Sequence, residues 1–395
     1  MTARVTDVAV VGAGTAGLAT ALGLARSGVA VTLVDTAAGS STRPGPTWSG
    51  VHHWSVLPIL DRLGVLDAAL VAGEATASWG ISVLATGERL VFDLRELGPE
   101  APYPFNLRLE PARLRAILRD ALLDHRVSIV DAPGIDGLRQ YVDGAVLTLP
   151  DGRGIAADWV VGADGPASGV RRATGLGFEG TTWTERGVVA VVDHDFTRQG
   201  YADTTLQVDG RAGAVVERLG PSTWRYVCQE SLALDEASVA LRLRGVLRRV
   251  TGGDPEVLGL ATARMHQRSA TSYRAGRVVL VAAAAHVTHP LAGHTSLTGW
   301  HDGATLVPVL HDALRAGVDD RVTAWADGRR RVFLDEAAPM SLARRNLIAQ
   351  IDDPARLAVE LDAFRRASAD PQLRRELLRA EHDAVAGDRS SLPPL

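Results

Sequence analysis

Four histidines lie close together in the last third of the chain. His286, His289, His294 and His301 fall within sixteen positions, and Asp302 follows the last of them directly. Because an imidazole exchanges protons near neutral pH, such a cluster predicts acid–base chemistry on a bound ligand. The spacing is weak evidence for metal ligation, and we expect no metal.

A glycine-rich turn near the N-terminus predicts a phosphate-binding site. It joins an apolar strand at residues 7–11 to an alanine- and leucine-rich helix that runs to Arg26, and a second apolar strand covers residues 29–34. In such a βαβ unit the glycines allow a tight turn and a close backbone approach to pyrophosphate, while an acid after the second strand suits a ribose hydroxyl. The candidate cofactor-binding residues of this unit are Gly12, Gly14, Gly17 and Asp35.

Strand-like segments in the middle of the chain predict an antiparallel sheet inserted into the α/β unit. These segments are residues 79–93, 188–192, 204–208, 214–218 and 224–229. Period-2 alternation places Trp224 and Tyr226 on one face and Arg225 and Val227 on the other. Glu217, on a sheet that faces a cavity, is a further candidate for a general acid.

Several tryptophans could wall a pocket for a large apolar or aromatic substrate. They are Trp48, Trp79, Trp183, Trp224 and Trp300. We therefore expect a hydrophobic or aromatic small molecule as the partner of this chain.

Composition excludes several classes of protein. The 395 residues carry 42 basic and 46 acidic side chains, so no basic excess exists to bind nucleic acid. All the basic residues are arginine, which excludes a P-loop and a Schiff-base enzyme. The single cysteine, Cys228, excludes a disulfide framework, and the longest apolar run is far shorter than a membrane span. We expect a cytoplasmic globular protein, and the composition leaves its oligomeric state open.

Two further segments make the chain resemble the group A flavoprotein monooxygenases, the aromatic hydroxylases typified by para-hydroxybenzoate hydroxylase. Residues 162–171 read GADGPASGVR, like the family's second fingerprint, and residues 277–286 stand where the family has a strand, Gly-Asp, two alanines and a histidine. The resemblance covers essentially the whole chain. It implies an α/β fold with a Rossmann-like FAD-binding domain, an inserted antiparallel substrate-domain sheet and C-terminal helices.

The resemblance also implies domain boundaries and cofactor contacts. The FAD-type domain would comprise residues 1–77, 106–178 and 264–318, the substrate domain residues 78–105 and 179–263, and the helical region residues 319–395. The glycine turn and Asp35 would hold the ADP half of FAD, and Asp164 would serve the second fingerprint. Arg43 and Arg108 fall near the family's flavin-contacting side chains, and NAD(P)H would bind only if FAD does.

The chain departs from the family where the flavin ring and its ribityl chain would lie. Ala282-Ala283 replaces Gly-Asp, so the aspartate that accepts hydrogen bonds from the ribityl chain is missing. Ala292, Thr295 and Leu297 replace Gly, Gly and Asn in the next loop, where we expect backbone strain or a clash. A lost charged hydrogen bond alone costs about 1.5–3 kcal/mol. We therefore expect FAD to bind weakly or not at all.

In the family the loop at residues 290–297 faces the substrate, which makes His294 and His289 the candidate catalytic residues. Resemblance implies a secondary-metabolite tailoring enzyme, and the eroded flavin site favours non-redox cyclisation, isomerisation or dehydration of a polyketide-like or polycyclic intermediate. The alternative is FAD- and NAD(P)H-dependent hydroxylation or epoxidation of such a substrate. A second alternative is a ligand-binding protein without catalysis.

Overall fold

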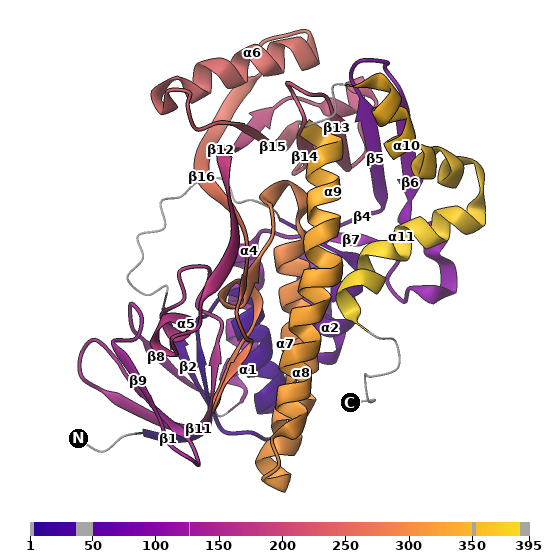
Figure 1. The fold of residues 1–395 in the computed structure, drawn as a ribbon. Coiled ribbons are helices and arrows are strands. Elements are labelled where there is room, and N and C mark those ends of the chain that lie inside the picture. The colour runs from indigo at the N-terminus through magenta and orange to yellow at the C-terminus, as the bar shows by residue number, and fades with distance from the viewer. Residues whose placement is uncertain (1–3, 37–49, 126, 350–352, 388–395) are drawn as a thin grey trace.

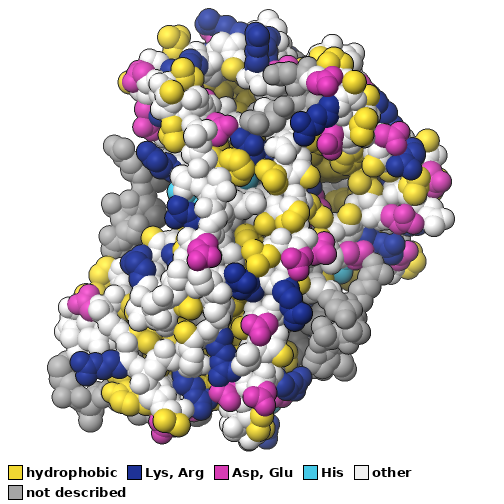
Figure 2. All heavy atoms as spheres, in the orientation of Figure 1, with side chains coloured by type: hydrophobic (Ala, Val, Ile, Leu, Met, Phe, Trp, Pro, Cys, Tyr) yellow, Lys and Arg dark blue, Asp and Glu magenta, His cyan; other side chains and the backbone are white. Residues whose placement is uncertain are grey.

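Two sheets and a set of long C-terminal helices make up the molecule (Figure 1). The computed structural model describes residues 4–36, 50–125, 127–349 and 353–387. On the face shown in Figure 2, positive and negative side chains are interspersed, in keeping with a net charge of −4. No helix within the described ranges is long and apolar enough to span a bilayer.

The first sheet carries the glycine-rich turn. Its strands are β1 (Arg4–Val11), β2 (Val31–Asp35), β8 (Ser128–Asp131), β9 (Gly137–Gln140), β10 (Ala145–Thr148), β11 (Gly154–Gly162), β17 (Arg274–Ala275) and β18 (Val278–Leu280). The order is β17-β18-β11-β1-β2-β8, with parallel pairing from β18 to β8 and the β9–β10 hairpin attached to β11. Val8, Val10 and Val11 are completely buried, as an apolar run in a parallel sheet predicts.

The second sheet is the inserted one. Its strands are β5 (Ser78–Val83), β6 (Arg89–Asp93), β12 (Phe178–Asp193), β13 (Thr204–Val208), β14 (Ala214–Arg218), β15 (Thr223–Ser231), β16 (Glu256–Ala270) and β19 (His286–Val287). The order is β19-β16-β12-β15-β14-β13-β5-β6, and every pair is antiparallel except β13–β5. Parallel neighbours need a long connection between them, and the segment of chain between β5 and β13 is long enough to provide it.

The two faces of this sheet differ as the alternation predicts. Trp224 and Tyr226 are fully buried in a cluster with Phe196 beneath α6 (Val239–Thr251), and Val227 packs on the opposite face. Trp224 is therefore a core residue, and its expected place in the pocket wall is wrong. A tryptophan that fills the α6 side of the sheet cannot also reach the other side.

A small third sheet and several short helices surround the first sheet. Strands β3 (Val51–His52), β4 (Glu74–Thr76) and β7 (Asn106–Arg108) form it, and the helices are α1 (Thr15–Arg26), α2 (Leu57–Arg62), α3 (Leu66–Ala72), α4 (Pro111–Leu123) and α5 (Gly169–Ala173). The chain from 51 to 63, which the sequence pattern suggests is one helix, divides into β3, a 3₁₀ turn at Trp54–Val56 and α2. Pro58 explains the late start of α2, because proline is tolerated only in the first turn of a helix.

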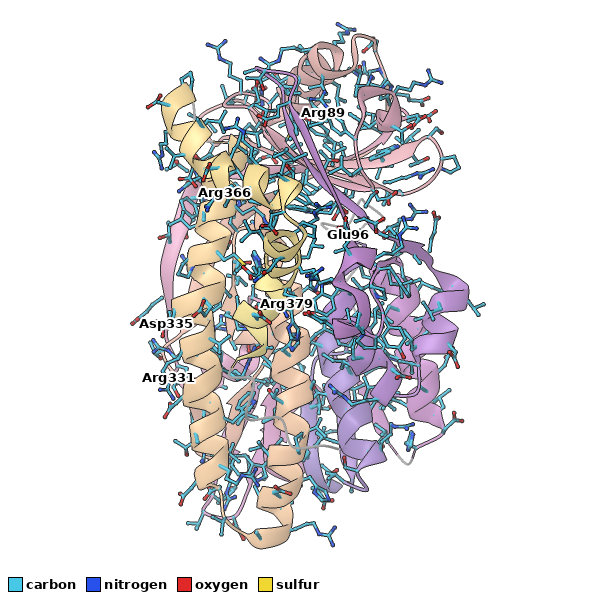
Figure 3. All side chains as sticks on the ribbon, turned by 90° about the vertical axis from the view of Figure 1, so that its right-hand side faces the viewer. Arg89, Glu96, Arg331, Asp335, Arg366 and Arg379 are labelled. Atoms are coloured by element: carbon cyan, nitrogen blue, oxygen red, sulfur yellow. The ribbon has the colours of Figure 1, made fainter. Side chains whose placement is uncertain are left out.

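The C-terminal part is helical. Its helices are α7 (His294–Ala316), α8 (Asp320–Arg331), α9 (Ala338–Ala349), α10 (Pro354–Ala369) and α11 (Pro371–Ala386). A π-helical turn at Val332–Ala337 joins α8 to α9, and the two helices run along the length of the molecule (Figure 1). The hairpin of α10 and α11 packs against β6 and the 3₁₀ segment Leu94–Glu100, where Figure 3 labels Glu96 and Arg379.

Candidate active site

The glycine-rich turn contains two glycines that packing requires and one that it does not. At Gly12 (φ +110°) a Cβ atom would stand 2.4 Å from the carbonyl oxygen of Ala163, and at Gly17 it would stand 2.0 Å from that of Gly12. At Gly14 the φ is −68° and a Cβ atom would meet nothing within 4 Å. Gly14 therefore faces open space, as a close approach to a phosphate demands.

The N-terminus of α1 is open to an anion. Gly14 is its N-cap, and among the described residues no side chain accepts from the first N–H groups of the helix, which leaves them for a ligand. Asp35, at the carboxyl end of β2, is buried, and Arg119 of α4 donates to its Oδ2 at 2.7 Å. The four predicted residues of this unit thus come together at one edge of the first sheet.

Asp164 shapes the loop that follows β11. Its Oδ1 accepts from the Ser168 hydroxyl at 2.5 Å, and its Oδ2 accepts from the backbone N–H groups of Gly169 and Val170 at 2.7 and 3.1 Å. The next arginine, Arg171, donates to the carbonyl oxygen of Ala284 at 2.8 Å. This loop is thereby tied to the segment that follows β18.

Of the two arginines predicted near the flavin, Arg43 lies outside the described residues. Arg108 ends β7, pairs with Glu74 and donates through Nη1 to the carbonyl oxygen of Arg218 at 3.2 Å, and it does not line the main cavity.

A cavity of about 900 Å³ lies between the two sheets and the C-terminal helices; we call it the main cavity. Thr15 and Pro166 line its nucleotide end, and Val215, Glu217 and Val227 line it from the second sheet. Its remaining walls include Trp79, His289, His294, Leu297, Trp300 and Phe364. Trp48 is outside the described residues, and Trp183 approaches the site only through the ring of His289.

His289 is a neutral hydrogen-bond donor at this cavity. The side chain is fully buried and its Nδ1 accepts from the backbone N–H of Leu291 at 3.3 Å, so the proton of the neutral ring resides on Nε2. Nε2 has no partner among the described residues. Burial, and then the charge of Arg345, lowers the pKa of His289 to about 3. His289 can therefore donate to a ligand oxygen and is a poor proton acceptor.

His294 could bond a ligand through either ring nitrogen, whereas His289 has only Nε2 available. It is the first residue of α7 and only 1% exposed, and neither ring nitrogen has a partner within the described chain. Burial, helped by Arg344 and His53, lowers the pKa of His294 well below the usual histidine value. An unsatisfied buried polar atom costs about 1–3 kcal/mol, so a ligand that bonds to this ring would recover that energy.

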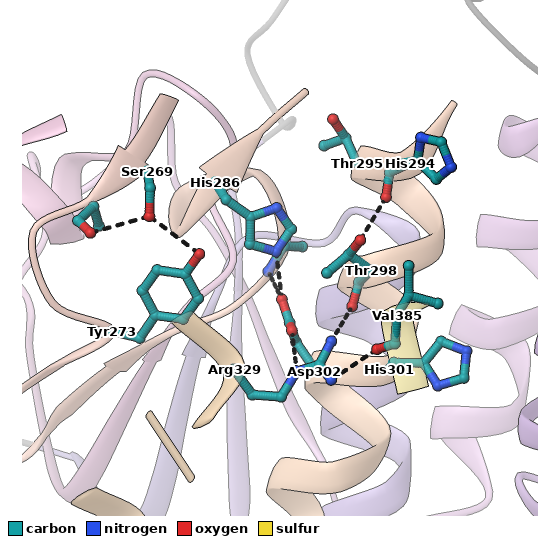
Figure 4. Close-up of polar contacts among 12 residues, drawn as sticks. Ser269, Tyr273, His286, His294, Thr295, Thr298, His301, Asp302, Arg329 and Val385 are labelled. Atoms are coloured by element: carbon teal, nitrogen blue, oxygen red, sulfur yellow. Dashed lines mark hydrogen bonds and ion pairs between the residues drawn. The ribbon is translucent and has the colours of Figure 1, made fainter. Parts of the chain in front are cut away.

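The other two histidines of the cluster serve the fold. His286 contacts Asp302 at 2.7 Å, and Arg329 donates to the same carboxylate at 2.7 Å (Figure 4). Burial alone would raise the pKa of Asp302, but Arg329 and His286 lower it to about 2. His301 and Asp302 lie inside α7 and do not cap a helix. Across the described ranges no three His, Cys, Asp or Glu side chains converge as a metal site.

Glu217 faces the main cavity but is held in a salt bridge. Arg225, which is 1% exposed, donates to Glu217 at 3.0 Å and to Glu110 at 2.9 Å. A carboxylate paired with a buried guanidinium is stabilised in its charged form, which makes it a weak proton donor.

Sequence reasoning missed a charged group on the far wall. Arg344 of α9 pairs with Glu381 of α11, and His53 Nε2 lies 3.9 Å from the same carboxylate. Burial lowers the pKa of Arg344 to about 10 and that of His53 to about 3. These three residues lie on elements far apart in sequence, and no local pattern marks them.

Comparison with known proteins identifies the family. A model described as an FAD binding domain matches residues 5–335. The chain is 34% identical to 6-hydroxy-3-succinoylpyridine 3-monooxygenase of Pseudomonas putida over 357 residues, which covers 87% of this chain and 89% of that enzyme. The chain belongs to the group A flavoprotein monooxygenases.

Two solved structures of similar fold extend this result. The p-nitrophenol 4-monooxygenase of Pseudomonas putida DLL-E4 superposes with a TM-score of 0.89 at 29% identity, and the match covers 98% of this chain and 100% of that one. A Diels-Alderase of pyrroindomycin biosynthesis shares the fold with a TM-score of 0.77 at 21% identity over 99% of this chain and 82% of that one.

The segment in which Ala282-Ala283 replaces the family's Gly-Asp pair has an unusual backbone conformation. Ala282 has φ +53° and is the single residue other than glycine with a positive φ in the described part of the chain. Its N–H donates to Asp302 Oδ2 at 3.1 Å, which holds this conformation. Ala283 lines the main cavity and offers no acceptor for a ribityl hydroxyl.

The backbone strain expected at Thr295 is absent. Thr295 lies in the first turn of α7 and has no positive φ, because Gly293 (φ +76°) takes the left-handed position. From His294 onward the chain is helix, and within the described residues no side chain caps the first turn of α7, which borders the main cavity. The α7 N-terminus therefore still presents N–H groups that suit negative charge on a bound ring. These residues fit FAD at the ADP end and at α7, with one ribityl acceptor missing.

Proposed function

We propose that the chain is an FAD- and NAD(P)H-dependent monooxygenase that hydroxylates a small aromatic substrate in the main cavity. The observation that carries this proposal is the open space at Gly14. Packing alone explains Gly12 and Gly17, whereas no contact within the described protein requires a glycine at Gly14, and a phosphate that approaches the turn would require one. For this reason we place hydroxylation ahead of the non-redox chemistry that the sequence favours.

Gly12, Gly14, Gly17 and Asp35 would hold the ADP half of the cofactor, and the α7 N-terminus would border its ring. When bound and reduced by NAD(P)H, FAD supplies the activation of oxygen for transfer of one oxygen atom. The overall reaction balances as ArH + O₂ + NAD(P)H + H⁺ giving ArOH + NAD(P)⁺ + H₂O.

The chain's own residues fix the position of the substrate. His289 donates through Nε2, and His294 can donate through one nitrogen and accept through the other, while Trp79 and Phe364 supply aromatic walls. This set suits a ring that carries a hydroxyl group and a second oxygen acceptor. The two monooxygenases compared above are named for a hydroxypyridine and a nitrophenol, which are rings of this kind.

Flavin binding is the first test. Purified protein should take up FAD, as flavin absorbance and fluorescence will report, and should oxidise NAD(P)H faster with a suitable phenol. Gly14→Val should weaken FAD binding about tenfold or more, since its side chain enters the phosphate space without a clash inside the protein. Gly245→Val, at an exposed glycine of α6 that also has nothing within 4 Å, is the matched control. A colourless wild type that ignores added FAD, or a Gly14→Val variant that binds FAD normally, contradicts the proposal.

The substrate contact needs its own variants. His289→Leu removes the Nε2 donor, and His289→Gln retains an N–H donor of similar reach. If His289 positions the substrate, the leucine variant should raise KM about tenfold and the glutamine variant should recover part of that loss. Equal losses in both variants would show that the imidazole matters only for packing.

One observation supports a second candidate function, which needs no flavin. Ala283 removes a flavin contact while the neutral rings of His289 and His294 remain at the cavity, which would serve non-redox cyclisation, isomerisation or dehydration. Product formation by flavin-free protein without NAD(P)H would establish that function. Saturable binding without turnover in either condition would leave a ligand-binding protein.

A further inference from the structure

A second cavity of about 390 Å³ lies between α2, α7 and α11. It shares no lining residue with the main cavity, yet residues that are neighbours in sequence line the two cavities. At three places in the chain, one residue lines the main cavity and the next residue lines the second cavity. The pairs are His53 and Trp54 in the 3₁₀ turn, Trp300 and His301 in α7, and Glu381 and His382 in α11.

An aromatic platform forms one side of the second cavity. The rings of Trp54 and His382 lie 5.2 Å apart with an interplanar angle of 34°. Pro58, Ile59 and Pro102 provide apolar surface around it. A flat ring can stack on such a platform and be enclosed by these walls.

Two hydrogen-bond donors at the second cavity lack an acceptor among the described residues. Trp54 is only 4% exposed, and its Nε1–H has no partner among the described residues; the same holds for the Nε–H of Arg379. The charges balance, because Arg62 and Arg379 stand against Glu100 and Asp383. A ligand that fits must therefore bring an accepting oxygen and need carry no net charge.

We propose that the second cavity binds a small, uncharged, planar aromatic molecule that carries a hydrogen-bond-accepting oxygen. Its ring stacks on Trp54 and His382, and its oxygen accepts from Trp54 Nε1 and Arg379 Nε. This site does not depend on the proposed hydroxylation, because it is separate from the main cavity and requires no flavin.

Benzamide is a suitable probe, since it is neutral and planar and has a carbonyl oxygen. We expect calorimetric titration of the full-length protein to show benzamide binding that Ala304→Phe removes, because that side chain would enter the second cavity from α7. Ala343→Phe, which fills the main cavity from α9, is the matched control and should leave this binding intact. Binding that survives Ala304→Phe, or that Ala343→Phe abolishes, would overturn the proposal, as would no binding at all.

Trp54→Phe tests the donor without removing the platform, and it decides the matter if Ala304→Phe does not fold. It should weaken benzamide about tenfold. Three analogues test the ligand class: toluene lacks the acceptor, cyclohexanecarboxamide lacks the flat ring and benzoate carries a charge. Each should bind about tenfold more weakly than benzamide, and equal affinity for benzoate would contradict the assignment of a neutral ligand.

Discussion

A side chain on Gly299 would begin 2.6 Å from the Cβ atom of Ala282. Ala282 stands at a left-handed position that favours glycine, and a glycine in the middle of α7 leaves room for its methyl group. The two residues thus form a matched pair, in which the missing side chain of Gly299 leaves room for the methyl group of Ala282.

Gly299→Ala should be destabilising despite the better helix propensity of alanine. The clash should cost about 1–3 kcal/mol in the free energy of unfolding, against a gain of about 1 kcal/mol from propensity. The double variant with Ala282→Gly should be at least as stable as wild type, because it removes both the clash and the strained φ. Urea unfolding of the four proteins checks this, and additive effects would contradict the pairing.

Ala283→Asp should strengthen FAD binding. A restored charged acceptor is worth about 1.5–3 kcal/mol, which corresponds to roughly 10- to 150-fold in affinity. Flavin fluorescence titration measures the effect, and Ala283→Asn is a neutral control with a smaller expected gain. If neither variant changes the affinity, another part of the site limits cofactor binding.

Acid should destabilise the protein through its buried histidines. The pKa of His289 is lowered to about 3 in the folded state, whereas the unfolded chain takes up that proton below about 6.5. The contribution of His289 is therefore complete above about pH 6.5 and is lost as the pH falls toward 3, at about 1.4 kcal/mol per pH unit. Urea unfolding at several pH values should show a shallower slope for His289→Gln.

Asp302 should be among the most sensitive positions for stability. Replacing it with alanine leaves Arg329 and His286 buried without their carboxylate, and losing one partner of a buried ion pair costs about 3–5 kcal/mol. Asp312→Ala, which removes a half-exposed partner of Arg321, should cost less than about 1 kcal/mol. Similar losses of stability in the two variants would show that the Asp302 network contributes no more than a half-exposed ion pair.

Two ion pairs should help to hold the α10–α11 hairpin against the chain around β6 and the segment Leu94–Glu100. Arg365 contacts Glu88 at 2.8 Å and Arg374 contacts Glu96 at 2.8 Å, both in partly exposed positions. The double variant Arg365→Gln with Arg374→Gln should speed hydrogen exchange in residues 354–386 and leave β1 unchanged, and high salt should do the same to wild type. Arg366→Gln, whose partner Asp362 lies within α10, is the control.

Sequence patterns predicted the parts of the fold that depend on local chemistry. The βαβ unit was recognisable from its glycines and apolar runs, and the bounds of β13 and β14 agree with their alternation. Strand β16 could not be found in this way. Its side chains are mostly half-buried on both faces, so no regular alternation marks its 15 residues.

The candidate site also combines residues that the sequence could reveal with residues that it could not. His289 and His294 could be singled out because they are clustered in sequence, and the structure places both at the main cavity. Arg344 and Glu381 could not, because an arginine on a polar helix gives no sign that tertiary packing will bury it. The strain expected at Thr295 was wrong because the sequence does not show that Gly293 would take the left-handed conformation.

The alternation of lining residues has a consequence for how this chain could change its range of ligands. Along α7 and α11, neighbouring positions line different cavities, so one substitution can reshape one chamber and leave the other as it is. The two chambers could therefore diverge independently, without a new loop or an added domain.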